Sequence, residues 1–236
     1  MIEIRRIYTG EVLHTHDGDD LKGVDFSGMD LQGACLPCVD LESANLSGAN
    51  LDHANLAGAK LSKANLIGTK SNCAILYKAN LTGADLSYAE VEYANLYAAN
   101  LTGAHLKGAK LSGADLRYAK LANAELKYAD LFVVLASYAS FIGANLENSY
   151  MRNADLRYAY LHFAILNNAD LRKTDFRGAS LKSASVKRAN LSCADLRGAC
   201  VKGTGLEKQY LNSCVNSTNL DDAFTHKTDL RRVVII

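Results

Sequence analysis

The chain has 236 residues, of which 49% are apolar and 22% charged, and this composition excludes a disordered polypeptide. The formal net charge is +1, so overall charge gives no reason to expect a nucleic-acid or membrane partner. The N-terminal residues lack the apolar core of a signal peptide, and no apolar run is long enough to span a bilayer. We therefore expect a cytoplasmic protein without a membrane association.

The first predicted element is a β-hairpin over residues 1–18. Two short stretches that alternate apolar and polar residues, at 2–8 and 11–16, flank the turn residues Thr9 and Gly10. This pattern is typical of two antiparallel strands joined by a tight turn. We expect the hairpin to cap the structure that follows, because an uncovered sheet edge tends to pair with other molecules.

From Leu21 to Leu211 an apolar residue returns at every fifth position in one frame, with the exception of position 71. Two positions before each stands a small residue, nearly always alanine, and the position between them is polar. Five helical residues rotate by about 500°, so successive leucines would form no single apolar face. On a flat strand the leucines would alternate between the two sides. The pattern therefore predicts a chain that turns once per repeat and points alanine and leucine inward.

The expected corner residues fit this reading. Glycine recurs at the second position after the leucine, for example at Gly48, Gly103 and Gly113, as expected for a corner with a positive φ. Asparagine, the next best residue there, takes the same place in other repeats. Other repeats have tyrosine in this place, and for some of these we expect a different turn type. They include Tyr88, Tyr93, Tyr118 and Tyr128.

Units such as ANLSG (44–48) and ADLRG (194–198) resemble those of the pentapeptide-repeat family, and the resemblance covers residues 19–230. It implies an all-β fold, a right-handed quadrilateral β-helix in which four repeats make one square coil. A solenoid of this length would have about 10–11 coils. The predicted organisation is a hairpin cap at 1–18, the β-helix at 19–230 and an apolar tail at 231–236.

Similar units recur at multiples of twenty residues, which predicts that their side chains stack in columns from coil to coil. The aspartates of one column are Asp115, Asp155, Asp175 and Asp195, and the arginines of the next are Arg117, Arg157, Arg177 and Arg197. Neighbouring columns of opposite charge are typical of a solvated surface that pairs with itself. A less favoured alternative is that arginines contact phosphates, so nucleic acid is not the expected partner. The arginines of that alternative are Arg152, Arg157, Arg172, Arg177 and Arg197.

The repeat is broken at three places. Ser71 replaces a leucine. At 134–136, Val134, Leu135 and Ala136 stand where alanine, a polar residue and leucine belong. One residue is missing between Leu211 and Val215. Breaks in a regular pattern are where functional residues are expected.

Near the second break, the residues expected to face outward become aromatic and apolar. Tyr118, Tyr138 and Tyr158 are spaced by twenty residues and should form a column. An exposed aromatic patch can mark a partner surface, but a ladder of rings that packs only on itself would show the same pattern. The candidate partner surface comprises Tyr118, Tyr138, Tyr158, Phe132, Val133, Ile142, Arg117, Arg157 and Arg177.

The chemistry of an enzyme is missing from the pattern. Histidines are scattered, and no phosphate-binding or dinucleotide-binding motif is present, so we expect no catalysis, cofactor or metal. The cysteines lack an export signal and are expected to be reduced. Cys35 and Cys38 form a CxxC motif without a second copy, which is only a weak sign of zinc or redox chemistry.

Two functions follow. The first is a structural scaffold that binds a protein partner of unknown identity. The second, implied by the family resemblance alone, is protection of DNA gyrase or topoisomerase IV from quinolones or toxins by mimicry of duplex DNA. That role goes with a strongly acidic surface, whereas the net charge here is −4 over residues 1–118 and +5 over 119–236. We expect a monomer, or a homodimer joined end to end through the C-terminal tail.

Overall fold

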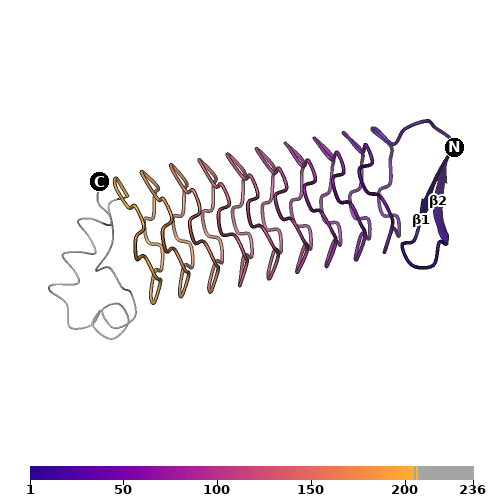
Figure 1. The fold of residues 1–236 in the computed structure, drawn as a ribbon. Helices are drawn as coiled ribbons and strands as arrows, with labels where there is room; N and C mark the ends of the chain where they lie inside the picture. The colour runs from indigo at the N-terminus through magenta and orange to yellow at the C-terminus, as the bar shows by residue number, and fades with distance from the viewer. Residues whose placement is uncertain (205, 207–236) are drawn as a thin grey trace.

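The chain forms an elongated rod of stacked coils. A computed structural model describes residues 1–204 and 206. Figure 1 shows the coils following one another along a single axis, with a two-stranded hairpin at the N-terminal end. The predicted frame change after Leu211 and the apolar tail at 231–236 lie outside the described residues.

One coil takes twenty residues, as the spacing of similar units predicted. The polar residue of each repeat makes a parallel bridge to the residue twenty positions later, from Asp25 with Asn45 to Ser180 with Cys200. Four repeats therefore complete one turn of a right-handed quadrilateral β-helix, and the described residues make about nine such turns. Every fifth residue consequently lies in one of four columns, and each column runs the length of the rod.

The interior is filled by the repeat's alanine and leucine side chains. Leu46, Leu101 and Leu156 have no exposed surface, nor do Ala49 and Ala104. Burial of one leucine stabilises the fold by about 1.5–3 kcal/mol before conformational entropy is subtracted, and this gain recurs at nearly every repeat. The core is thus one continuous column that is apolar apart from a few hydroxyl side chains, among them Ser71, which is buried in the place of a leucine.

The break at 134–136 leaves this core intact. Val134 and Ala136 are fully buried, so the larger side chain has moved to the alanine position and the smaller one to the leucine position. Together the two side chains are only one methylene smaller than an alanine and a leucine, a change of volume that a core accommodates at modest cost. On the outer side of the same repeat, Leu135 occupies the position of a polar residue and exposes 41% of its surface to solvent.

Every corner from residue 23 to residue 203 has the same backbone conformation, with a positive φ at the second position after the central residue. The amide of the next alanine closes the turn, as when Ala119 donates to the carbonyl of Leu116 at 2.9 Å. The expectation of another turn type at tyrosine corners was wrong, because φ is +61° at Tyr118 and +59° at Tyr88. Hydrogen bonds to neighbouring coils hold these residues in a conformation that isolated residues avoid.

The hairpin consists of β1 (Ile2–Arg5) and β2 (Val12–His16), paired antiparallel. Its Ile4 side chain is buried against the first coil. A backbone hydrogen bond also joins the hairpin to the first coil, because the amide of Cys35 donates to the carbonyl of Arg5 at 2.8 Å. These bonds occupy backbone groups that the first coil would otherwise leave open. Among the described residues no helix is long and apolar enough to cross a membrane.

Candidate protein-interaction surface

Five tyrosine rings form a ladder along one corner of the rod. The centroids of Tyr118 and Tyr138 are 5.1 Å apart with planes at 3°, and those of Tyr138 and Tyr158 are also 5.1 Å apart. Toward the N-terminus, Tyr97 lies 5.3 Å from Tyr118, and Tyr77 lies 5.8 Å from Tyr97. This spacing follows from the coil repeat, because one coil rises by about the distance between two hydrogen-bonded strands. The predicted column of three tyrosines is therefore part of a longer ladder.

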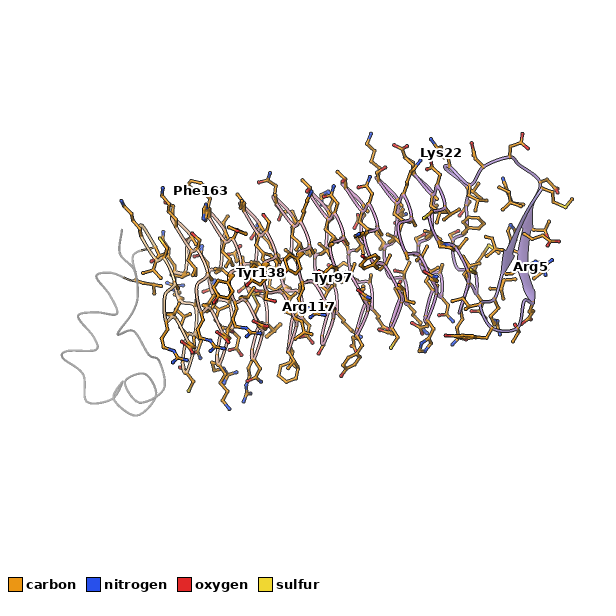
Figure 2. All side chains as sticks on the ribbon, in the orientation of Figure 1. Arg5, Lys22, Tyr97, Arg117, Tyr138 and Phe163 are labelled. Carbon is orange, nitrogen blue, oxygen red and sulfur yellow. The ribbon has the colours of Figure 1, made fainter. Side chains whose placement is uncertain are left out.

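The ladder changes position between Tyr97 and Tyr118. Tyr77 and Tyr97 occupy the first corner position, whereas Tyr118 and its successors occupy the second. Ala98 leaves room beside Tyr97, and the guanidinium of Arg117 lies over the Tyr97 ring at 5.7 Å from its centroid. Figure 2 shows Tyr97, Arg117 and Tyr138 close together in the middle of the rod. A search for residues exactly twenty apart therefore misses Tyr77 and Tyr97; a search that allows either corner position would find them.

The rings pack on each other and still face solvent. Tyr118, Tyr138 and Tyr158 are 48%, 42% and 50% exposed. Their faces are covered by neighbouring rings, so their edges and hydroxyl groups are what a partner would meet. Tyrosines in such a position have their side chains already ordered, which lowers the entropy lost on binding.

Beside the ladder runs a column of aspartate–arginine pairs. Each arginine donates through Nε and Nη2 to the aspartate two residues before it, with Nη2–Oδ2 distances of 2.8 Å for Arg157 and 2.6 Å for Arg177. The same geometry holds at Arg117 and Arg197. Between coils, Nε of Arg157 lies 3.7 Å from Oδ2 of Asp175. The predicted self-pairing of these columns is what the structure shows.

These pairs set the electrostatics of the surface. Hydrogen bonds from Arg197 lower the pKa of Asp195 below its ordinary range. Burial alone would raise the pKa of Asp155, but the hydrogen bonds and charge of Arg157 outweigh it and the pKa is lowered. The aspartates stay ionised and keep the arginine donors occupied. A phosphate would therefore have to displace an existing carboxylate.

One coil interrupts the pairs. Leu135 and Ser137 stand where Asp and Arg stand in the flanking coils, and Leu135 bridges to Asp115 on one side and to Asp155 on the other. Ser137 is buried, while Leu135 is exposed next to the tyrosine ladder. The interruption is an apolar gap between two ion pairs. Sequence reasoning noted the break but did not place Leu135 on the partner surface; its exposed polar position in the repeat was the available signal.

The remaining predicted residues do not all join this surface. Phe132 and Val133 form the corner that precedes Leu135, and Ile142 belongs to the corner that follows Tyr138 and the next face. All three are exposed, as predicted. Because the two corners are diagonal to each other in a square coil, a flat partner on the Leu135 face would not reach Ile142. The candidate surface is therefore defined as the tyrosine ladder together with Leu135 and the adjoining arginine pairs.

Other predicted features are separate from it. Cys35 and Cys38 are exposed free thiols. Within residues 1–204 and 206 no group of three or more metal-binding side chains is present. Arg172 is bound by Asp170 at 2.5 Å, in the manner of the other arginines. Arg152 makes no ion pair with another described residue.

Comparison with known proteins agrees with the repeat and the fold. The family model for pentapeptide repeats matches in eight copies, within residues 20–48, 38–70, 74–103, 99–132, 137–173 and 169–207. No curated protein matches the sequence.

Solved structures of the same kind are similar to this chain. HetL, described as a pentapeptide repeat protein involved in heterocyst differentiation regulation, from the cyanobacterium Nostoc sp. strain PCC 7120, is 32% identical; the match covers 80% of this chain and 93% of HetL, with a TM-score of 0.42. QnrB1, a plasmid-mediated fluoroquinolone resistance protein, is 21% identical over 77% of this chain and 89% of its own, with a TM-score of 0.50. By its repeats and its coil, this chain belongs to the pentapeptide-repeat family.

Proposed function

We propose that the protein is a non-catalytic scaffold that binds a protein partner through the tyrosine ladder and Leu135. The observation behind the proposal is the single interruption of the Asp–Arg column beside exposed, pre-stacked rings. Tyrosine and arginine are the residues most enriched at energetically dominant positions of interfaces. An apolar gap between ion pairs gives such an interface a centre from which water is excluded.

The architecture supports a binding role over a catalytic one. The interior is filled by packed alanine and leucine, and the surface residues of the repeat stand in flat columns. Catalysis requires groups that converge on a bound substrate. A rigid rod with an ordered surface instead favours recognition by a partner that needs little reorganisation of the protein.

The test compares two triple variants of the full chain. The first carries Tyr118→Ala, Tyr138→Ala and Tyr158→Ala. The control carries Tyr88→Ala, Tyr93→Ala and Tyr128→Ala, three tyrosines that are also exposed but outside the ladder. We expect proteins captured from the native host by the wild type to be lost with the first variant and retained with the control, at equal thermal stability. Equal capture by both variants would reject the proposed site.

A gyrase assay tests the alternative role. The likeness to QnrB1 extends to the fold, and the aspartate column here is neutralised by arginines rather than left as the unpaired charge that resembles a DNA backbone. We therefore expect no protection of purified gyrase from a quinolone in a supercoiling assay. Protection at stoichiometric amounts would replace the scaffold proposal with the alternative.

A further inference from the structure

A different side of the rod carries charges that would face opposite charges on a second copy running in the opposite direction. It consists of the face whose outward residues run from Lys70 to Asp170 in steps of twenty, and the adjoining corner from Glu92 to Arg152. We name this side the pairing face. We propose that two copies of this chain associate side by side and antiparallel through it.

The distribution of charge along the chain sets the direction. Residues 1–118 hold ten cations and fourteen anions, while residues 119–236 hold sixteen cations and eleven anions. Two parallel copies would place like charges against each other over the length of the rod, and two antiparallel copies place the acidic half against the basic half. Complementary charge of this kind mainly determines orientation and register.

The corner column shows the complementarity residue by residue. In order from the N-terminal side it presents Glu92, Ser112, Phe132 and Arg152, each one coil from the next. A two-fold axis between the middle two places Glu92 opposite Arg152, and it does so twice because the interface is isologous. The same axis places the large Phe132 opposite the small Ser112.

The second corner position adds to this fit. Val133 would lie opposite Gly113, and both Phe132 and Val133 are exposed in the single chain, at 42% and 41%. A large residue facing a small one on each copy lets the two corners approach closely. The apolar contact thus lies at the centre, with the charges on either side of it.

The face beside the corner agrees with the same axis. Lys110 would lie opposite Asp130, and Lys70 opposite Asp170, again twice each. A shift by one coil would instead oppose Glu90 and Asp170, so the charges favour one register. At the corner on the other border of the face, Lys107 of one copy would lie opposite Lys127 of the other. The charge of Lys127 is offset within its own chain by Glu147, whose Oε2 lies 3.0 Å from the Lys127 Nζ.

Two of the groups that carry the proposal already have partners in the single chain, since Lys110 pairs with Glu90 at 2.8 Å and Asp170 with Arg172 at 2.5 Å, so the corner charges carry most of the argument. Glu92 and Arg152 form no ion pair with a described residue, and within the chain they interact only at longer range, Glu92 with Lys110 and Arg152 with Asp170. Glu92 and Arg152 are three coils apart, about 14 Å, which is beyond the reach of an ion pair within one chain. Residues 70–170 span about 24 Å of the rod, so the contact is narrow and the association should be weak and sensitive to salt.

The proposal is independent of the partner surface. The tyrosine ladder lies at the next corner, beyond the face of Leu135, and stays uncovered in the antiparallel pair. A dimer would therefore present two ladders that run in opposite directions.

The experiment is a charge exchange followed by sedimentation equilibrium of the full chain at low and high salt. The wild type should dimerise at low salt and dissociate at high salt. Glu92→Arg and Arg152→Glu should each raise the dimer dissociation constant more than tenfold. The double variant should restore it to near the wild-type value, because the exchanged charges meet again only across the two copies.

A control variant separates this effect from net charge. Lys120→Glu changes the charge by the same amount as Arg152→Glu but lies on the opposite face of the coil, and it should leave dimerisation unchanged. A dimer that survives both single variants would point to an end-to-end contact and overturn the proposal. A monomer at all concentrations and salts would overturn it as well.

Discussion

The ring of Tyr158 covers Gly178 of the next coil so closely that a Cβ added to the glycine would lie 2.5 Å from Cε1 of the tyrosine. The same relation holds between Tyr93 and Gly113. In these two pairs the ring lies over the corner of the following coil, where the glycine leaves room for it. Gly178 is thus where the tyrosine ladder ends.

This relation gives a matched pair of glycine variants. Gly103 also has a positive φ, +65°, but a Cβ there would meet nothing within 4 Å. Gly103→Ala should therefore cost only the backbone term, about 1 kcal/mol. Gly178→Ala should cost about 1 kcal/mol more, because the Tyr158 ring must move.

Spectroscopy provides a second readout for these variants. The chain has twelve tyrosines, six phenylalanines and no tryptophan, so near-ultraviolet circular dichroism at wavelengths beyond the phenylalanine bands reports on the tyrosines. Gly178→Ala should reduce that signal and Gly103→Ala should leave it unchanged. Identical spectra and identical unfolding free energies in the two variants would contradict the covering role of Tyr158.

A second prediction concerns backbone strain at Val133. Among the described corner residues with a positive φ it is the β-branched one, with φ at +53°. Branching at Cβ makes this conformation especially unfavourable, and a residue held there stores about 1–3 kcal/mol. Val133→Gly should raise the free energy of unfolding by about 1 kcal/mol in urea titrations. Gly103→Val, the reverse change at an open corner, should lower it; a loss of stability in both variants would show that the Val133 side chain contributes more than the strain costs.

A third prediction concerns hydroxyl groups in the core. Ser149 stands in an alanine position, is buried, and its Oγ has no hydrogen-bond partner. Thr174 stands in an equivalent position, but its Oγ1 donates to the carbonyl of Met151 at 2.8 Å. Ser149→Ala should stabilise the fold by about 1 kcal/mol, and Thr174→Val should destabilise it by a similar amount. Thermal unfolding of the two variants measures both effects, and the expectation fails if they shift the midpoint in the same direction.

The coil could be predicted from the sequence because a five-residue period of apolar residues fits neither a helix nor a flat strand. The same pattern also recurs in nearly every repeat, so the prediction does not depend on any single unit. Leu135 shows the limit of such reasoning. The repeat frame places Leu135 outward, but only the folded structure shows that Ser137 near it is buried and that the apolar gap lies beside the tyrosine ladder. The tyrosine corners show another limit. Propensity argues against a positive φ at Tyr118, yet amide hydrogen bonds from coil to coil, such as Tyr118 to the carbonyl of Ser137, outweigh it.

The last prediction is a dependence of stability on pH. Hydrogen bonds from Arg172 lower the pKa of Asp170, and those from Arg197 do the same for Asp195. A carboxyl group with a lowered pKa in the folded state stabilises the fold fully above its unfolded pKa, about 3.9. This stabilisation is lost as the pH falls through the lower folded value. The free energy of unfolding should thus be nearly flat above about pH 5 and fall below about pH 4.

A variant of one pair isolates its share of this dependence. Arg172→Gln should destabilise the protein at pH 7, and the difference from the wild type should shrink as Asp170 becomes protonated in both. Lys173→Gln removes a neighbouring exposed charge that pairs with no described residue, so its difference from the wild type should vary far less with pH. Added salt should weaken the Arg172 effect at pH 7, since the guanidinium is partly exposed. An Arg172→Gln difference that stays constant from pH 7 to below pH 3 would mean that the arginine stabilises the rod by packing rather than by its charge.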